Sequence, residues 1–146
     1  MTMSAEDVTR QFFSRISNHD VTGAMDLVAP DASVRLVPLN IEGRMRAEGR
    51  AFLESLVEAF PDLYIRVRRL FVTTESVAAV EITIDGTQGG DFLGIVNQEK
   101  HLDLDLAWLL RVGPSGLIED VQAYWCRNQL YRRLAVKRLD QISITA

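Results

Sequence analysis

Two histidines, two neighbouring aspartates and one cysteine are the side chains with the clearest potential for chemistry. A histidine titrates near neutral pH and could act as a general base, and the chain contains His19 and His101. Asp103 and Asp105 lie two residues apart, the spacing that places paired carboxylates on one face of a strand. The single cysteine, Cys126, could be a nucleophile only beside a base in an electropositive setting. The elements that position these residues decide which of these roles is open to them.

The stretch His101–Val112 predicts a strand and sets the direction of both aspartates. Its even-numbered residues from Leu102 to Trp108 are apolar and Asp103 and Asp105 lie between them, the pattern of a strand with one buried face. Asp103 and Asp105 then lie on the opposite face, where solubility or a dimer rim explains them better than catalysis. His101 begins the strand after a turn, so we expect it to face solvent.

The other candidates also have simple structural explanations. His19 lies in a polar break between two helices, where capping or exposure is expected. Cys126 has an arginine beside it but no histidine nearby in the sequence, which favours an unreactive, half-buried thiol. Trp108 and Trp125, on neighbouring predicted strands, could line a pocket for a flat ligand or simply fill the interior. Gln88 is the polar residue most in phase with the inward face near the mouth of the sheet.

Three helices are predicted before the middle of the chain. The first begins at the capping hydroxyl of Ser4, is followed by first-turn acids, and ends at the polar break 18–20. The second is short, places Val28 on its apolar face and ends at Pro30-Asp31. The third is Arg50–Phe60 and stops at a proline, because the residue before proline is displaced from helical backbone angles.

Five strands are predicted from alternating or β-branched residues, at Ser33–Pro38, Leu63–Val72, Val77–Asp85, His101–Val112 and Leu117–Trp125. Asn40–Gly49 is polar and predicts a loop, with a brief strand near Met45 as an alternative. Gly86–Gly94 has four glycines but lacks the lysine and following helix of a phosphate loop, so it predicts a wide bend or a strand exchange. A basic helix is predicted from Arg127 to Leu139.

The composition indicates one globular domain spanning residues 1–146. The chain is 47% hydrophobic and 25% charged, its apolar runs are short of a membrane span, and its start lacks a secretory signal pattern. A single cysteine precludes an internal disulfide and fits a reducing, cytoplasmic location. The formal net charge is -4, with a basic excess only near the C-terminus. We therefore expect neither a nucleic acid nor a membrane as a partner.

The order of elements predicts an α+β fold. Helices come first and four long antiparallel strands follow, which describes a curved antiparallel sheet wrapped around three N-terminal and central helices. Such a cone has one open mouth, and a strongly bent sheet leaves a cavity over its helices. Cavities of this kind are where small molecules bind.

Several short segments carry a family resemblance across residues 5–135. They are Phe60-Pro61-Asp62-Leu63, Val77-Ala78-Ala79-Val80 before Gly86-Thr87, Gly90-Asp91-Phe92-Leu93-Gly94-Ile95, Lys100, Arg111-Val112, Gly116 with Ile118-Glu119, and Tyr124 ahead of Leu130 and Leu134. In this order and spacing the chain resembles the polyketide-cyclase-like branch of the nuclear-transport-factor-2-like (NTF2-like) superfamily, typified by nogalonic acid methyl ester cyclase. The resemblance implies a cone-shaped fold and a homodimer through the outer face of the sheet. It also implies a hydrophobic pocket with no metal and no organic cofactor.

In the cyclases the resemblance further implies an aspartate and a histidine that move protons during an aldol closure. Alignment by eye places the family's histidine at Trp108 and its aspartate at Ala123, while a second acidic position falls on Cys126. The usual pair is therefore expected to be replaced. Two functional readings remain: a cofactor-free cyclase or isomerase for a polyketide-like or carbocyclic substrate, or a non-catalytic module that binds a small molecule or another protein.

The expected pocket accepts a small, largely hydrophobic molecule, and its catalytic residues are not identified. Its predicted lining is Phe13, Met25, Val34, Leu36, Phe60, Ile82, Gln88, Leu104, Leu106, Trp108, Val121, Ala123 and Trp125.

Overall fold

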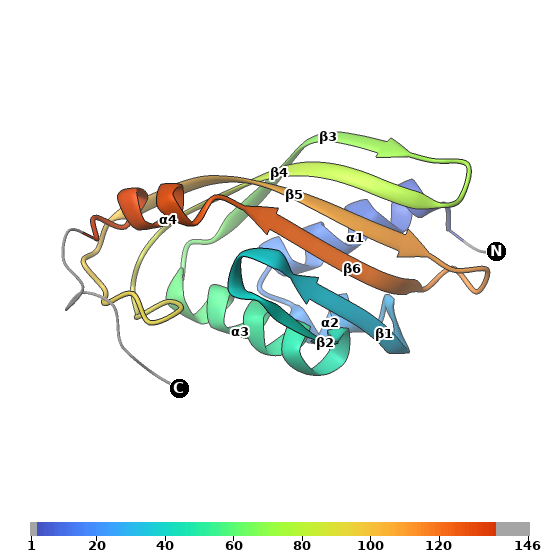
Figure 1. The fold of residues 1–146 in the computed structure, drawn as a ribbon, viewed down its shortest axis with the longest axis horizontal. Coiled ribbons are helices and arrows are strands. Elements are labelled where there is room, and N and C mark those ends of the chain that lie inside the picture. Colours follow the sequence, from blue (N-terminus) through green and yellow to red (C-terminus); the bar gives the residue numbers. More distant parts are fainter. Residues whose placement is uncertain (1–2, 137–146) are drawn as a thin grey trace.

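The structure is a curved sheet packed over helices (Figure 1). It is a computed structural model and describes residues 3–136. The helices are α1 (Ala5–Ser17), α2 (Val21–Met25), α3 (Arg50–Ala59) and α4 (Arg127–Arg133). The strands are β1 (Val28–Leu36), β2 (Ile41–Arg44), β3 (Tyr64–Val72), β4 (Val77–Thr87), β5 (His101–Val112) and β6 (Ile118–Trp125). The predicted α+β class is confirmed.

The six strands form one sheet in the order β2-β1-β6-β5-β4-β3. The strands from β3 to β6 are antiparallel to their neighbours, as predicted. β1 and β6 instead run parallel, with Val34 beside Val121, so the expectation of a wholly antiparallel sheet is wrong at this pair. These two strands are far apart in the sequence, and no hairpin between them imposes an antiparallel direction.

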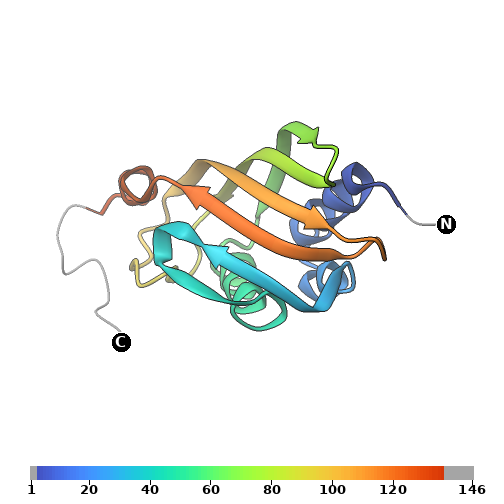
Figure 2. The ribbon, with the colours of Figure 1, turned by 45° about the vertical axis from the view of Figure 1, so that its right-hand side comes forward.

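Helices α1, α2 and α3 cover one face of the sheet, and α4 continues beyond the end of β6 (Figures 1 and 2). The burial of β5 follows this arrangement, because its even-numbered residues are buried and its odd-numbered residues are exposed. The predicted direction of this strand is therefore confirmed. One side of the sheet forms the interior of the cone, and the other carries the charged residues.

Side-chain caps position the first two helices. The Ser4 hydroxyl accepts a hydrogen bond from the Asp7 amide at 3.1 Å, which satisfies one of the free N–H groups at the start of α1. The Asp20 carboxylate accepts from the Gly23 amide at 2.8 Å and caps α2 in the same way. Between these helices, His19 adopts a positive φ of 64° and turns the chain.

The second helix is shorter than predicted and the first strand begins earlier. α2 ends at Met25, and Val28 lies in β1 rather than on a helix face. Strand pairing explains the difference, because the Ile118 amide donates to the Leu27 carbonyl at 2.9 Å and Val28 pairs with Ile118. Pro30 follows at an irregularity of the ladder, where a residue without an N–H group is tolerated.

The loop predicted for Asn40–Gly49 is wrong. β2 occupies its first part and pairs with β1, and a short π-helix, Met45–Gly49, occupies the rest. The brief strand predicted near Met45 corresponds to β2, which ends one residue earlier, at Arg44. Met45 itself is helical and buried. Asn40 has a positive φ of 53°, a conformation that asparagine tolerates and that allows the tight turn into β2.

Segment 88–100 closes one end of the cone, beneath α4 (Figure 1). The Gly89 amide donates to the Ala59 carbonyl at the end of α3, at 2.7 Å. A Cβ at this glycine would lie 2.9 Å from Cδ of Pro61, so the close approach requires glycine. The Gln98 side-chain amide donates to the Leu134 carbonyl at 3.1 Å and ties the segment to the end of α4.

α4 ends at Arg133, before the predicted end at Leu139. Positions 137–139 of that prediction lie outside the described residues.

Candidate functional site

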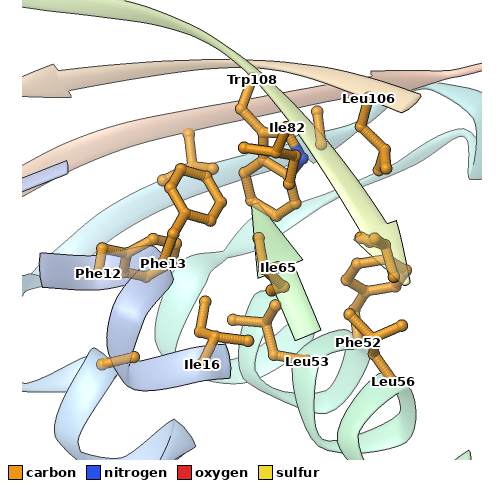
Figure 3. Packing of buried hydrophobic residues seen from close by; sticks show 14 of the residues in the cluster. Phe12, Phe13, Ile16, Phe52, Leu53, Leu56, Ile65, Ile82, Leu106 and Trp108 are labelled. Atoms are coloured by element: carbon orange, nitrogen blue, oxygen red, sulfur yellow. The ribbon is translucent and has the colours of Figure 1, made fainter. Parts of the chain in front are cut away.

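Aromatic side chains from α1 and β5 fill the middle of the cone (Figure 3). Trp108 is 1% exposed and meets Phe13 edge-on, with ring centroids 5.3 Å apart. Phe12 lies 6.4 Å from the same indole, and Ile82 of β4 is fully buried beside them. This part of the interior is packed core.

A small, partly enclosed cavity lies toward the end of the cone that segment 88–100 closes. The space open to the centre of a water-sized sphere is about 10 Å³, about what one water molecule requires. The lining comes from α3, β4, β5, β6, α4 and the closing segment, and consists of Phe52, Leu56, Ile84, Phe92, Leu102, Leu104, Leu106, Trp125 and Leu130. Every lining side chain is hydrocarbon apart from the indole N–H of Trp125.

Trp125 lies at the boundary of this cavity. Its ring stacks on Phe52, with centroids 5.4 Å apart and planes at 19°. Its indole nitrogen is buried and has no hydrogen-bond partner. The same residue also lines a surface groove of about 330 Å³, formed with Val37, Pro38, Tyr124 and the first residues of α4.

The two positions aligned with the cyclase acid–base pair lie directly opposite each other. Trp108 of β5 pairs with Ala123 of β6, and both are buried on the inner face. The fold thus brings together the two positions that the resemblance aligns with the histidine and aspartate of the cyclases. Neither side chain here can accept a proton near neutral pH, and the indole nitrogen of Trp108 has no hydrogen-bond partner.

Among residues 3–136, the buried polar side chains are Thr9, Thr83 and Gln88. Thr83 donates to the Asp105 carboxylate at 2.8 Å, on the outer face of the sheet. The Gln88 side-chain amide donates to the Ile95 carbonyl at 3.2 Å and so stabilises the closing segment. In this part of the chain, none of the buried side chains is titratable.

Three of the predicted pocket residues, Leu104, Leu106 and Trp125, lie on the cavity wall. The other ten lie in the surrounding buried core and do not line this cavity: Phe13, Met25, Val34, Leu36, Phe60, Ile82, Gln88, Trp108, Val121 and Ala123.

Sequence reasoning missed six wall residues, Phe52, Leu56, Ile84, Phe92, Leu102 and Leu130. The apolar stripe of the third helix contains Phe52 and Leu56, and strand alternation directs Ile84 and Leu102 inward. Phe92 carried no such signal, because its inward position depends on the bridge between Phe92 and Ile95.

Both histidines lie away from the cavity. His101 Nε2 lies 2.6 Å from the Asp85 carboxylate and Nδ1 lies 3.2 Å from the Thr87 hydroxyl, all partly exposed on the outer face. His19 is exposed, and its Nε2 lies 3.4 Å from the Leu63 carbonyl. Cys126 is exposed at the start of α4 rather than half-buried, so that expectation is wrong.

The outer face of the sheet carries an ion-pair cluster around Glu81. Arg69 pairs with this carboxylate at 2.6 Å, and Arg68 contacts it at 3.2 Å. The hydrogen bond from Arg69 is the main cause that holds the pKa of Glu81 below its ordinary value. Arg68 also reaches Asp105 at 3.2 Å, so the cluster joins β3, β4 and β5.

Two further observations concern what the described part of the chain contains. Within residues 3–136, no three His, Cys, Asp or Glu side chains gather in a group that could hold a metal ion. No helix in this part is both long enough and apolar enough to cross a membrane.

Solved structures with the same fold include enzymes assigned to polyketide chemistry. AclR, a candidate hydroxylase from Streptomyces galilaeus, matches with a TM-score of 0.80 and 20% identity over 92% of this chain and 97% of that one. A candidate SnoaL-like polyketide cyclase from Jannaschia sp. CCS1 matches with a TM-score of 0.79 and 16% identity, over 92% and 93%. IdmH, a candidate polyketide cyclase from Streptomyces antibioticus, matches with a TM-score of 0.76 and 18% identity, over 92% and 100%.

At these identities the likeness shows the fold alone, which is the NTF2-like cone expected from the sequence. No curated protein sequence matches the chain. The model of one family, the SnoaL-like domain, matches residues 9–121. This match spans most of the chain, so the protein belongs to the SnoaL-like domain family.

Proposed function

We propose that this protein binds a small, largely apolar molecule in the interior of the cone without the acid–base pair of the cyclases. The observation that carries the proposal is the partly enclosed cavity, whose wall consists of apolar side chains. An apolar molecule gains free energy by leaving water for such a wall, whereas a charged one would lose its hydration without a partner. Family membership adds support, because relatives of this fold are named as polyketide cyclases.

Binding requires the cavity to open, since its present space is about that of one water molecule. Phe92 and Leu130 are the wall residues from the closing segment and α4. Outward displacement of these two side chains would open the cavity to solvent at this end of the cone without breaking the sheet. Leu93 and Glu99 in the same segment have positive φ angles of 50° and 58°, conformations that cost energy and mark it as the less stable wall.

A cofactor-free cyclase or isomerase is the second candidate function. It is favoured by the family and by the opposed positions Trp108 and Ala123, which the resemblance aligns with the proton-transfer pair of the cyclases. General acid–base assistance is typically worth about 100- to 10,000-fold in rate. We therefore expect the unaltered protein to bind without turnover, and the double change Trp108→His with Ala123→Asp to introduce aldol closure of a cyclase substrate.

The binding proposal is tested with indane, an apolar bicyclic compound, added to methyl-labelled protein. We expect NMR shifts at the methyl groups of Leu102, Leu104 and Leu106, while Leu109 on the outer face stays unchanged. Leu104→Phe would fill the cavity and abolish these shifts. Leu109→Phe, the same substitution on the opposite face of β5, would retain them.

Unchanged spectra at saturating indane would refute interior binding and favour the protein-interaction module. Shifts at the outer face instead would contradict the proposed location. Turnover of a cyclase substrate by the unaltered protein would establish the second candidate.

We also propose a homodimer through the outer face of the sheet. Support comes from the apolar residues exposed there, Phe71 at 61% and Leu109 at 36%, beside exposed Ala107. Val67, which we expected on the same face, pairs with Ile82 before an irregularity in β3 and packs against the core instead. Helices cover only the inner face, and a partner would remove these side chains from water.

A further inference from the structure

Gln98 of the closing segment holds the end of α4 with its side-chain amide. Its Nε2 donates to the Leu134 carbonyl and to the Ala135 carbonyl, at 3.1 Å each. Both partners can only accept a hydrogen bond, so the contact requires the NH₂ group of the glutamine. The bond joins the closing segment to α4, and these two parts of the chain bring Phe92 and Leu130 to the wall of the cavity (Figure 1).

α4 depends on its surroundings to remain helical. It has seven residues, and a helix of this length is marginal by itself. No side-chain hydrogen bond caps its start at Cys126. At its other end Ala135 has a φ of 59°, a conformation in which glycine is usual and alanine costs energy. The Gln98 amide satisfies carbonyl groups at this strained end, so losing it should release the helix.

The closing segment has anchors that do not involve α4. The Gln88 amide donates to the Lys100 carbonyl at 3.0 Å and closes the base of the segment, while the Gly89 amide reaches the Ala59 carbonyl of α3. Inside the segment, the buried side chain of Gln88 donates to the Ile95 carbonyl at 3.2 Å. The strained backbone of the segment therefore lies between fixed points, and these can stay in place while α4 moves.

From these contacts we propose that α4 is a lid over the cavity, hinged at Cys126 and latched by Gln98. Cys126 is exposed and is the single residue between the end of β6 and the start of α4. Release of the latch carries Leu130 away from Phe92 and opens the cavity, while the strands stay paired. The buried side chains of Leu130 and Leu134 oppose this movement, so the closed form dominates.

This inference rests on the interior binding proposed above. It adds the interaction that controls how fast a molecule enters and leaves the cavity.

The test uses Gln98→Glu, which keeps the size of the side chain and replaces the amide donors with carboxylate oxygens. The backbone amides of Leu130 and Leu134 are hydrogen-bonded within α4, so their hydrogen exchange reports release of the helix. We expect this exchange to become about tenfold faster, equivalent to about 1.4 kcal/mol, while the amides of β5 keep their rates. Gln11→Glu, the same substitution at an exposed position of α1, is the matched control and should change neither.

Indane gives a second measurement, followed by NMR exchange between the free and bound protein. Because the latch is closed both before and after binding, Gln98→Glu should increase the association and dissociation rates about tenfold each, with little change in Kd. A residue that only shapes the wall would change Kd instead. If the variant fails to fold, hydrogen exchange in the unaltered protein decides, since the α4 amides should exchange together and before those of β5.

The outcomes separate this inference from interior binding. Unchanged exchange of α4 in Gln98→Glu, or exchange of α4 no earlier than that of β5, would overturn the latch and leave interior binding intact. A weaker affinity for indane with unchanged rates of entry would also overturn it. Faster exchange of α4 in a protein that does not bind indane would support the latch and refute interior binding.

Discussion

Phe92→Ala should destabilise the protein and at the same time open its cavity. Phe92 is 3% exposed, and its ring lies 5.4 Å from that of Phe60 and 6.2 Å from that of Phe52. Removing a buried phenylalanine side chain costs about 3–5 kcal/mol. For a chain of this size, each kcal/mol lowers the melting temperature by about 2–4 °C. We therefore expect the melting temperature to decrease by about 6–20 °C. Values near 6 °C are favoured, because segment 88–100 can partly collapse into the space that the ring leaves.

The assay is thermal unfolding followed by circular dichroism, with Val96→Ala in the same segment as the control. Val96 is 39% exposed, so its truncation should change the free energy of unfolding by about 0.5 kcal/mol or less. Phe92→Ala should also bind indane more tightly than the unaltered protein, because indane no longer has to displace the Phe92 ring. Equal melting shifts for the two variants would contradict the placement of segment 88–100 as the wall of the cavity.

Three further predictions concern the two faces of the sheet. Leu104→Asp should unfold the protein or lower its stability by several kcal/mol, since it buries an unpaired charge, while Asp103→Asn should change the melting temperature little; comparable shifts would mean that β5 faces the other way. Arg69→Gln should raise the pKa of Glu81, measured by NMR titration, and an unchanged pKa would exclude their hydrogen bond as its cause. In the unaltered protein the stabilisation from this pair is present above the unfolded pKa of the carboxyl and is lost as the pH falls through its lower folded pKa. Sedimentation at micromolar concentration should give a homodimer, and a monomer would refute that proposal.

The candidate site was only partly predictable, and the reason differs between residues. Strand alternation placed Leu104 and Leu106 on the inner face correctly, because the period of two depends on no distant contact. Phe92 could not be placed, since its glycine-rich segment has no periodicity and is held by contacts with α3 and with the end of α4. Inner-face position also did not identify the cavity wall, because Phe13 and Trp108 face inward and fill the cone instead.

The amino-acid sequence by itself determined the fold class, the four antiparallel strands, the buried face of β5 and the absence of histidine and aspartate at positions 108 and 123. These features are local, since they follow from residue periodicity, caps and residue identity. The tertiary structure alone decided that β1 runs parallel to β6, that segment 88–100 folds back over the mouth, and how much space remains inside. Each of these depends on packing between residues far apart in the chain. The volume of the cavity, for example, is a small difference between the space that the curved sheet encloses and the volume of the side chains that fill it.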